Sequence, residues 1–232
     1  TGTGKTLAFG IPMLQILARE KSRGLVLLPT RELAEQVDAE LHKIGQPFGL
    51  KTAILIGGLS IKPQSEALLK RPHIIIATPG RLIDHLEQKT VKLDSVSILV
   101  LDEADRMLDM GFQPQIKRIL QNLPKDRQTM LFSATLPHEI MAIASTYMKL
   151  PVRIEVAPPG TTIEKVSQEI FIVRREGKLE LLQKLLRDYS GSTLIFTRTK
   201  YGAKHVVQTV RMMGHSAAEI HGNRSQGQRR DA

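Results

Sequence analysis

The stretch LVLDEADRML, residues 99–108, decides the fold class and raises the first functional question. An aliphatic run leads directly into three acidic residues, Asp102, Glu103 and Asp105. Such a run is typical of a strand that is buried on both faces of a parallel sheet. Carboxylates at the end of a buried strand are costly unless they are paired, hydrated or bound to a cation. The function of the chain depends on which of these holds here.

The overall composition is that of a soluble globular protein. The chain has 232 residues, 41% of them hydrophobic, and a mean hydropathy of −0.12, which suits one large domain or two smaller ones. No stretch reaches the roughly 20 apolar residues of a membrane span, and no signal peptide precedes the first motif. The absence of cysteine excludes disulfides and thiolate metal sites. It suits a reducing compartment, and we expect a cytoplasmic protein without a membrane partner.

The charge of the chain indicates a polyanionic partner. The formal net charge is +10 and the sequence pI is about 9.9. Nucleic acid is the partner that such a balance favours, and an anionic membrane surface comes second. A basic protein without any polyanionic partner remains the alternative at this point.

Short aliphatic runs alternate with amphipathic stretches along the first two thirds of the chain. The spacing of Leu33, Val37, Leu41 and Ile44 predicts a helix over 31–44 with one apolar face. Repeated strand–helix units predict a parallel sheet with helices on both sides. The runs that we interpret as buried strands are 24–30, 52–58, 73–80, 97–104 and 129–135.

A Pro-, Gly- and Thr-rich stretch, APPGTTIEK at 157–165, predicts a linker between two domains. We expect a first α/β domain over 1–156 and an incomplete second α/β domain over 166–232. In the second domain we predict helices over 178–188 and 200–213 and strands over 168–174, 193–199 and 216–222. The first and last residues suggest an internal piece of a longer protein.

The opening hexapeptide, TGTGKT at 1–6, has the form of the second half of a phosphate-binding loop. Gly2 and Gly4 allow backbone N–H groups to face an anion at a helix N-terminus. Lys5 can reach the outer phosphates of a nucleotide, and the Thr6 hydroxyl can bind Mg²⁺. The alternative is a glycine-rich helix start that binds nothing.

The acidic strand end supplies what such a loop requires. An ATPase of this kind needs a carboxylate for the Mg²⁺ shell and a group that positions the attacking water. We assign Asp102 to the metal and Glu103 to the water. The alternative is that this Asp–Glu pair forms a helix N-cap with an acidic first turn.

At this point the sequence resembles the DEAD-box RNA helicases of helicase superfamily 2, in their bacterial form. Beyond TGTGKT and DEADRMLDMGF at 102–112, the matching blocks are PTRELAEQ at 29–36, GG at 57–58 with Gln64, TPGR at 78–81, SAT at 133–135, LIFTRTK at 194–200 and IHGNRSQGQR at 220–229. The resemblance implies an α/β fold with two tandem RecA-like P-loop domains, the second truncated. It also implies ATP bound by Thr1, Gly2, Thr3, Gly4, Lys5 and Thr6, with Mg²⁺ held by Thr6 and by Asp102, directly or through water.

Three of these blocks lie where a predicted strand passes into a helix, so they can share one rim of the sheet. Helix N-termini, backbone N–H groups and arginines at such a rim can hold the phosphates of one strand. Taken alone, each block also has a purely structural interpretation as a turn or a first helical turn. The resemblance assigns RNA contacts to Pro29, Thr30, Arg31, Gly57, Gly58, Thr78, Pro79, Gly80, Arg81 and Thr199.

The resemblance also separates the third carboxylate from the first two. In this family the last acidic residue of the DEAD block, here Asp105, hydrogen-bonds to the serine and threonine of SAT, here Ser133 and Thr135. This contact couples the nucleotide site to the RNA surface. Arg106 has no assigned role, and we expect it to be exposed or to form a local ion pair.

The sequence thus predicts a monomeric, RNA-stimulated ATPase that opens short RNA duplexes without sequence preference, with ATP and Mg²⁺ as cofactors. An ATP-gated RNA clamp or scaffold is the first alternative, and a P-loop helicase acting on DNA is the second. The family's upstream Gln block and downstream Arg-rich block have no counterpart in the chain, so we expect these 232 residues alone to hydrolyse ATP poorly.

Overall fold

The chain folds into two compact units. The structure, a computed structural model, describes residues 4–155 and 166–232. The units are Thr1–Thr161 and Thr162–Ala232. The division falls in the segment 157–165, which the sequence predicts as a linker and which lies outside the described residues.

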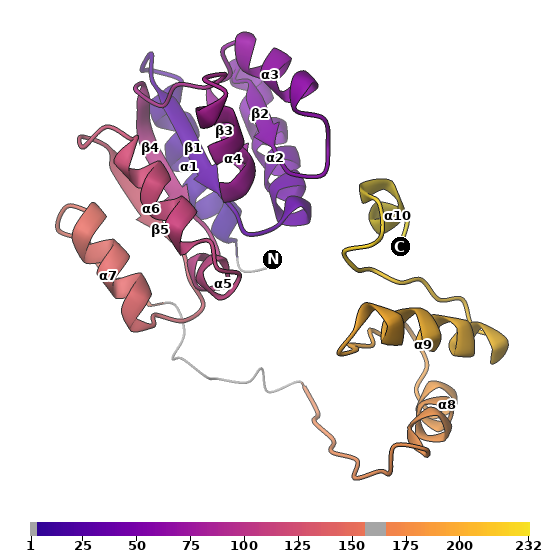
Figure 1. Cartoon of the computed structure of the whole chain (residues 1–232). Helices are drawn as coiled ribbons and strands as arrows, with labels where there is room; N and C mark the ends of the chain where they lie inside the picture. The colour runs from indigo at the N-terminus through magenta and orange to yellow at the C-terminus, as the bar shows by residue number, and fades with distance from the viewer. Residues whose placement is uncertain (1–3, 156–165) are drawn as a thin grey trace. The chain divides into compact units, whose positions relative to one another are not determined.

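The first unit is built on a five-stranded sheet in which every neighbouring pair of strands is parallel (Figure 1). The strand order is β2-β3-β1-β4-β5. Each strand lies at one of the five predicted aliphatic runs, which confirms the predicted α/β class with a parallel sheet. The bounds are β1 Arg23–Leu27, β2 Thr52–Leu55, β3 Ile74–Ala77, β4 Val96–Leu101 and β5 Gln128–Leu131.

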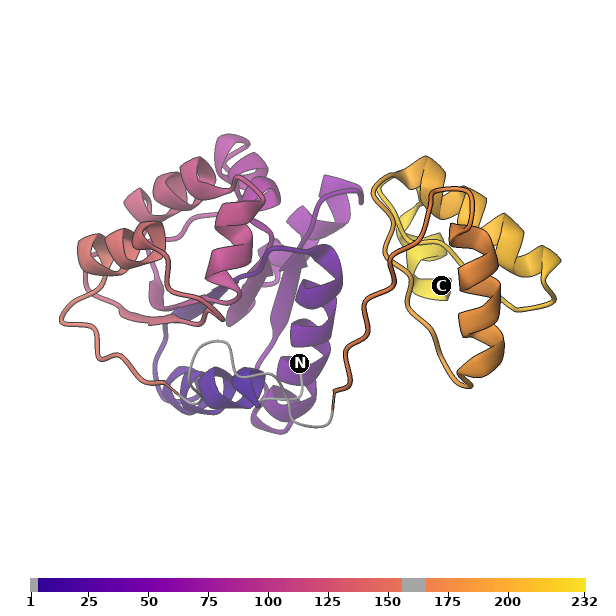
Figure 2. The same ribbon diagram turned by 90° about the horizontal axis from the view of Figure 1, so that it is seen from below.

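Helices cover both faces of this sheet, as Figure 2 shows. One face packs against α1 (Lys5–Leu17) and α2 (Arg31–Gly45), which is followed by the short 3₁₀ helix η1 (Gln46–Phe48). The other face packs against α3 Ile61–Leu69, α4 Pro79–Glu87, α5 Ala104–Asp109, α6 Gln113–Gln121 and α7 His138–Tyr147. Right-handed crossovers between parallel strands require this placement of helices on the two faces.

Alternate residues of each strand enter two separate cores. On β1, Leu25 and Leu27 belong to the core under α3–α7, whereas Val26 belongs to the core under α1 and α2. All three side chains are fully buried. Burying each such side chain contributes about 1.5–3 kcal/mol. The near-continuous apolar runs of the sequence follow from this two-sided burial.

The second unit contains three helices and, within residues 166–232, no strand (Figure 1). The helices are α8 (Lys178–Asp188), α9 (Lys200–Met212) and α10 (Gln226–Asp231), and the first two confirm the predicted helices. The prediction of strands over 168–174, 193–199 and 216–222 is wrong, because the structure forms no strand at these residues. A strand is stabilised by the partners that pair with it, and here the apolar side chains of these segments stay largely exposed, as at Ile172 and Phe196.

The helices of the two described ranges include none that is both long enough and apolar enough to cross a membrane.

We predict that Leu99→Ala lowers the free energy of unfolding by about 2–5 kcal/mol, because Leu99 is fully buried at the centre of β4 and the smaller side chain leaves a cavity. Leu69→Ala is the matched control, since Leu69 is 80% exposed and its loss should change stability by less than about 0.5 kcal/mol. Urea unfolding followed by circular dichroism measures both. Equal effects of the two substitutions would contradict the assigned core.

Candidate functional site

The motif residues meet at the edge of the sheet where the strands end. Hydrogen bonds join the segments that follow β1, β4 and β5 at this carboxyl edge. The Asp102 N–H donates to the Leu27 carbonyl at 3.0 Å, the Phe132 N–H to the Leu101 carbonyl at 2.8 Å, and the Ala104 N–H to the Phe132 carbonyl at 3.0 Å. The acidic block and SAT therefore lie side by side, as neighbouring parallel strands require.

Asp102 is the buried carboxylate of this edge. Its exposed fraction is 4%, and its Oδ1 accepts a hydrogen bond from the Glu103 N–H at 2.9 Å. Burial raises the pKa of the Asp102 carboxyl above its ordinary value, and this effect exceeds the opposing effects of the Glu103 N–H and the positive charge of Lys5. A cation beside Asp102 would favour the ionised form that burial disfavours.

The donor set fits a magnesium ion that arrives with a nucleotide. Among the described residues, no group of three or more His, Cys, Asp or Glu side chains could hold a metal ion without further ligands. Mg²⁺ prefers oxygen ligands and commonly binds one or two protein groups together with substrate phosphates. Asp102 offers a buried carboxylate, and Thr6 offers a hydroxyl in the first turn of α1.

Glu103 stands in a strained backbone conformation between β4 and α5. Its φ of 50° and ψ of 50° are left-handed values, which cost a residue other than glycine roughly 1–2 kcal/mol. Glu103 occupies the N-cap position of α5, but its side chain forms no capping hydrogen bond, and the acidic residue of the first turn is Asp105. The Glu103 Oε2 instead accepts a hydrogen bond from Arg106 at 3.1 Å, which confirms the expected local ion pair of Arg106.

The described part of the phosphate-loop motif begins at Gly4, whereas Thr1, Gly2 and Thr3 lie outside the described residues. Gly4 has a φ of 72° and directly precedes α1. A side chain at Gly4 would meet no atom within 4 Å, so the backbone conformation, and not lack of space, requires glycine here. Lys5 and Thr6 follow in the first helical turn, and the charge of Lys5 acts on Asp102.

Asp105 holds the SAT segment by hydrogen bonds. Its Oδ2 accepts the Thr135 N–H at 2.9 Å and the Thr135 hydroxyl at 2.8 Å, and its own N–H donates to the Ser133 hydroxyl at 3.2 Å. Burial alone would raise the pKa of the Asp105 carboxyl, but these bonds and the Arg106 N–H together lower it below its ordinary value. The ionised form is therefore the one that this contact stabilises.

Arg31 lies directly against the Gly57–Gly58 turn. The Thr30 hydroxyl accepts the Leu33 N–H at 3.3 Å and so caps α2. A side chain built on Gly58, whose φ is +76°, would overlap the Arg31 guanidinium, and one on Gly57 would approach it to 3.2 Å. The left-handed φ of Gly58 favours glycine there, and a side chain at either position would require the Arg31 guanidinium to shift. Two of the predicted RNA-contact blocks thus form one surface.

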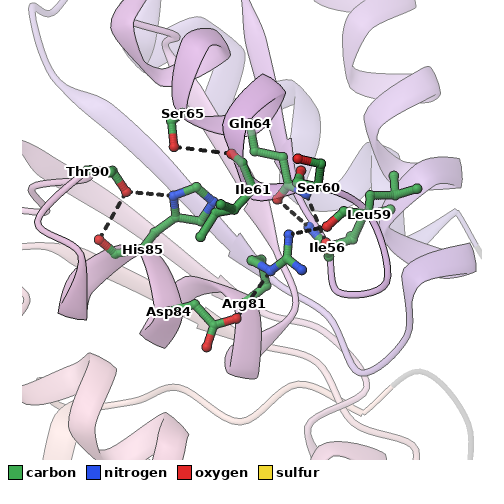
Figure 3. Close-up of polar contacts among 10 residues, drawn as sticks. All are labelled: Ile56, Leu59, Ser60, Ile61, Gln64, Ser65, Arg81, Asp84, His85 and Thr90. Atoms are coloured by element: carbon green, nitrogen blue, oxygen red, sulfur yellow. Dashed lines mark hydrogen bonds and ion pairs between the residues drawn. The ribbon is translucent and has the colours of Figure 1, made fainter.

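Gln64 has a structural role that the sequence did not reveal. It is 6% exposed, and its side chain forms two bonds with the backbone of Ile56: Oε1 accepts the Ile56 N–H at 3.1 Å and Nε2 donates to the Ile56 carbonyl at 3.0 Å. A third bond, from Nε2 to the Ser60 carbonyl, measures 3.1 Å. Gln64 therefore fixes the chain immediately before and after the Gly57–Gly58 turn (Figure 3).

The Arg81 side chain is largely buried and forms hydrogen bonds within the protein, so its guanidinium is not freely available to a phosphate. Its side chain is 11% exposed, its Nη1 donates to the Leu59 carbonyl at 2.9 Å, and its Nε donates to Asp84 at 3.2 Å (Figure 3). Arg81 thus ties the first turn of α4 to the loop after Gly58. Thr78 and Pro79 precede and begin that helix and are themselves buried.

His85, one turn beyond Arg81, is a fully buried histidine that the sequence analysis did not single out. Its Nδ1 lies 2.7 Å from the Thr90 hydroxyl, which itself donates to the His85 carbonyl (Figure 3). Burial, and then the charge of Arg81, lowers the pKa of the His85 imidazole, so the neutral form is favoured. No signal in the sequence distinguishes such a buried histidine from an exposed one.

In the second unit, Thr199 caps a helix. Its hydroxyl accepts the Gly202 N–H at 3.0 Å at the start of α9. The contacts of Thr199, like those of the other RNA-contact residues, define its place in the fold, and its role toward RNA stays a prediction.

Comparison with known proteins extends these observations. The family described as DEAD/DEAH box helicase matches residues 1–143. Over 99% of its length, the chain is 42% identical to a protein of Bacillus licheniformis and 41% identical to one of Bacillus subtilis, both named DEAD-box ATP-dependent RNA helicase CshA. It covers 48% and 47% of those proteins, so the chain spans about half the length of the curated relatives it matches.

Two solved structures are similar as well. The crystal structure of a DEAD box protein from the hyperthermophile Methanococcus jannaschii is 37% identical with a TM-score of 0.65, over 100% of this chain and 62% of that one. The crystal structure of a hypothetical ATP-dependent RNA helicase from Sulfolobus tokodaii is 39% identical with a TM-score of 0.60, over 65% of this chain and 44% of that one.

A parallel sheet flanked by helices, with a Gly-Lys-Thr helix start and an Asp–Glu strand end, defines an α/β domain of the P-loop class. Within that class, the chain belongs to the DEAD/DEAH box helicase family. The resemblance inferred from its sequence is confirmed.

We predict that Gln64→Leu lowers the free energy of unfolding by about 1–3 kcal/mol, because it leaves the buried N–H and C=O of Ile56 without their partner. The Ile56 and Gly57 amides should also exchange their protons faster, as hydrogen-exchange measurements can show. The control is Glu66→Ala, an exposed position on the same helix. Unchanged exchange at both amides would contradict the assigned role of Gln64.

We also predict that Asp102→Asn raises the free energy of unfolding of the nucleotide-free protein at neutral pH. The pKa of Asp102 is raised on folding, so the wild-type carboxyl is best tolerated below its ordinary pKa, and stability is lost as pH rises through the folded value. Asparagine stays neutral and can still accept the Glu103 N–H.

Urea unfolding at neutral pH, and again below the ordinary Asp pKa, measures this effect. The gain from Asp102→Asn should disappear at the lower pH, and Asp109→Asn, at an exposed carboxyl on α5, should show no such pattern. An Asp102→Asn protein that is less stable than wild type at neutral pH would overturn the prediction.

Proposed function

We propose that the protein to which this chain belongs is an ATP-dependent RNA helicase, in which RNA-stimulated ATP hydrolysis drives local opening or remodelling of RNA duplexes. One observation carries the proposal above the others. Asp102, Glu103 and Asp105 stand on one short segment that contacts SAT, at the same sheet edge as the three RNA-contact blocks. Family membership and the names of the relatives support it.

In this proposal, the nucleotide side of the edge is formed by residues 1–6 and by the end of β4. Lys5 and the backbone N–H groups at the start of α1 would hold the phosphates, and Thr6 and Asp102 would hold Mg²⁺, which would supply neutralisation of phosphate charge. Glu103 orients the attacking water and accepts its proton. To do so, Glu103 has to share or release its ion pair with Arg106.

RNA lies along the other part of the edge. Arg31 and the Gly57–Gly58 turn offer a guanidinium and backbone N–H groups, and the N-terminus of α4 offers a third contact to successive phosphates. Arg81 and Gln64 position this surface from behind, because their polar groups are directed at the loop itself. Phosphate contacts carry no sequence information, so binding is sequence-independent and weakens as salt rises.

Asp105 couples the two sides. Its ionised carboxylate holds Thr135, so a displacement of the Asp102–Glu103 segment by bound nucleotide moves SAT with it. We further propose two tandem RecA-like domains, with 1–156 and 166–232 belonging to the first and second, Thr199 as an RNA contact in the second, and a monomer as the active form. A cytoplasmic location stays a prediction of the sequence.

An ATP-gated RNA clamp without productive unwinding is the second candidate. The ion pair between Glu103 and Arg106 favours it, because it engages the carboxylate that hydrolysis requires. A clamp would bind RNA in response to ATP, but RNA would not stimulate turnover.

We predict that, in the full-length protein, single-stranded RNA stimulates ATP hydrolysis and DNA of the same sequence does not. Lys5→Ala should weaken nucleotide binding by at least tenfold, because it removes the cation next to the phosphates. Glu103→Gln should retain nucleotide binding but reduce turnover by on the order of a hundredfold or more, through loss of the group that orients water. Phosphate release and binding of a fluorescent ATP analogue measure these effects.

The control for Glu103→Gln is Asp109→Asn, which changes an exposed carboxyl at the end of α5, the helix that follows Glu103. ATP-dependent RNA binding with no RNA-stimulated turnover would favour the clamp. Equal turnover of Glu103→Gln and wild type would remove Glu103 from its role, and stimulation by DNA would contradict the RNA assignment.

A further inference from the structure

The positive charge of the first unit is concentrated at the amino edge of the sheet, opposite the edge that carries the motifs. The loops that precede the five strands contain nine Lys or Arg and three Asp or Glu. The rest of residues 1–150 contains ten Lys or Arg and twelve Asp or Glu. The motif loops 28–30, 56–60, 102–103 and 132–137 contain no Lys or Arg. The loops that precede the strands are 18–22, 46–51, 70–73, 88–95 and 122–127.

Hydrogen bonds join the loops before β2, β3 and β4 to one another through the start of β1. The Lys51 N–H donates to His73 Nδ1 at 3.0 Å, and the His73 N–H donates back to the Lys51 carbonyl at 2.8 Å. The Gly24 N–H donates to the His73 carbonyl at 2.9 Å, and the Arg23 N–H to the Ser95 carbonyl at 2.8 Å. Side chains from loops distant in the sequence are therefore neighbours.

Most of the basic side chains at this edge face solvent. Eight of the nine are exposed and form no ion pair with a carboxylate in the described parts of the chain: Arg19, Lys21, Lys51, Lys70, Arg71, Lys89, Lys92 and Lys125. Arg127 differs, because its guanidinium donates to the carbonyls of Pro124 and Tyr147 and burial lowers its pKa. We call these eight residues together with Phe48 the amino-edge surface.

Phe48 adds an aromatic ring to this basic surface. It is 68% exposed, in η1, and the next residue, Gly49, turns the chain with a φ of 70°. Only Gly49 and Leu50 separate Phe48 from Lys51. An exposed ring close in the chain to a lysine can help to hold a single-stranded nucleic acid, since a ring stacks on a base while cations hold phosphates.

Helix dipoles account for only part of the charge. Helices in this fold run back to the amino edge, where their C-termini favour basic residues. Neither α1 nor α3 has a basic residue in its last turn, and Lys51 and Lys92 stand nearer the starts of β2 and β4 than the ends of helices. Arg71 has a φ of 50°, a left-handed position after α3 that glycine would occupy without strain.

We propose that the amino-edge surface is a second RNA-binding surface, which holds a single-stranded segment of the same RNA outside the part bound at the carboxyl edge. It rests on the proposed RNA helicase function. Its cations bind phosphates, and Phe48 stacks on one base. A folded helicase unit would then hold its substrate at two opposite edges, and long RNAs would bind more tightly than short ones.

The test is a triple substitution in the full-length protein, Lys51→Gln, Lys70→Gln and Lys92→Gln. Binding of long poly(U) should weaken by about tenfold at low salt, and the slope of log affinity against log salt should fall by roughly one for each phosphate that the variant no longer neutralises. A short oligo(U) that fills only the carboxyl edge should bind and stimulate ATP hydrolysis as with wild type. Lysine-to-arginine substitution at the same three positions should retain poly(U) binding.

The matched control neutralises three exposed lysines elsewhere, Lys117, Lys178 and Lys184. Equal poly(U) affinity of the amino-edge variant and this control would overturn the proposal, as would an equal loss on the short oligo(U). Displacement of poly(U) by polyglutamate as readily as by RNA would identify an acidic protein as the ligand and also overturn it. If wild type bound neither RNA, the proposed function itself would fail, which separates the two outcomes.

A second variant tests the aromatic contact. Phe48→Ala should weaken poly(U) binding by about tenfold and leave the salt slope unchanged, because stacking involves no counterion release. Leu69→Ala removes another exposed apolar side chain, at 80% exposure, in the helix just before Lys70 and Arg71 and should have no effect. An unchanged affinity of Phe48→Ala, or a loss equal to that of Leu69→Ala, would overturn the stacking role.

Discussion

Parallel pairing of the five strands is the constraint on which the rest of the first unit depends. Because each strand must be re-entered from the same end, every connection crosses back over a face of the sheet, and helices fill both faces. The same rule gathers the residues that follow each strand at one edge and those that precede it at the other. Blocks separated by about a hundred residues, such as Lys5 and Asp102, thereby come under each other's electrostatic influence.

The carboxyl edge is not the most stable arrangement that this chain could have. Asp102 is held in a place that disfavours its charge, and Glu103 adopts a left-handed backbone that a glycine would tolerate better. The pKa of Asp105, two residues after Glu103, is lowered, because the effect of four hydrogen bonds exceeds the opposing effect of burial. Neighbouring carboxylates thus differ in the sign of their pKa displacement. Strain and unfavourable burial that cluster in this way are typical of sites where a ligand supplies the missing interaction.

Much of the first unit could be predicted from sequence, and the limits have physical causes. Buried parallel strands give continuous apolar runs, so all five strands and helix α2 were found, and a strand end with adjacent acids marked β4. Gln64 and His85 were missed as structural residues because burial of a polar side chain depends on partners such as Ile56 and Thr90, which local patterns do not reveal. TPGR was correctly placed where a strand passes into a helix, but the inward hydrogen bond from Arg81 to the Leu59 carbonyl could not be foreseen. The prediction of strands in the second unit was wrong because an apolar run indicates only a local preference for extended backbone. A strand also needs a neighbouring strand with which to form hydrogen bonds.

The net charge illustrates how composition and motif can point to different places on one molecule. A pI near 9.9 predicts a polyanionic partner, and the motifs assign one to the carboxyl edge. Yet the loops of that edge contain no lysine or arginine, and the phosphate contacts proposed there come from backbone N–H groups and from the few arginines in helix first turns, such as Arg31. Backbone donors select phosphates at short range, whereas lysines attract them over about 10 Å at ordinary salt. If both proposed surfaces bind RNA, the carboxyl edge would position the phosphates and the amino edge would attract them from a distance.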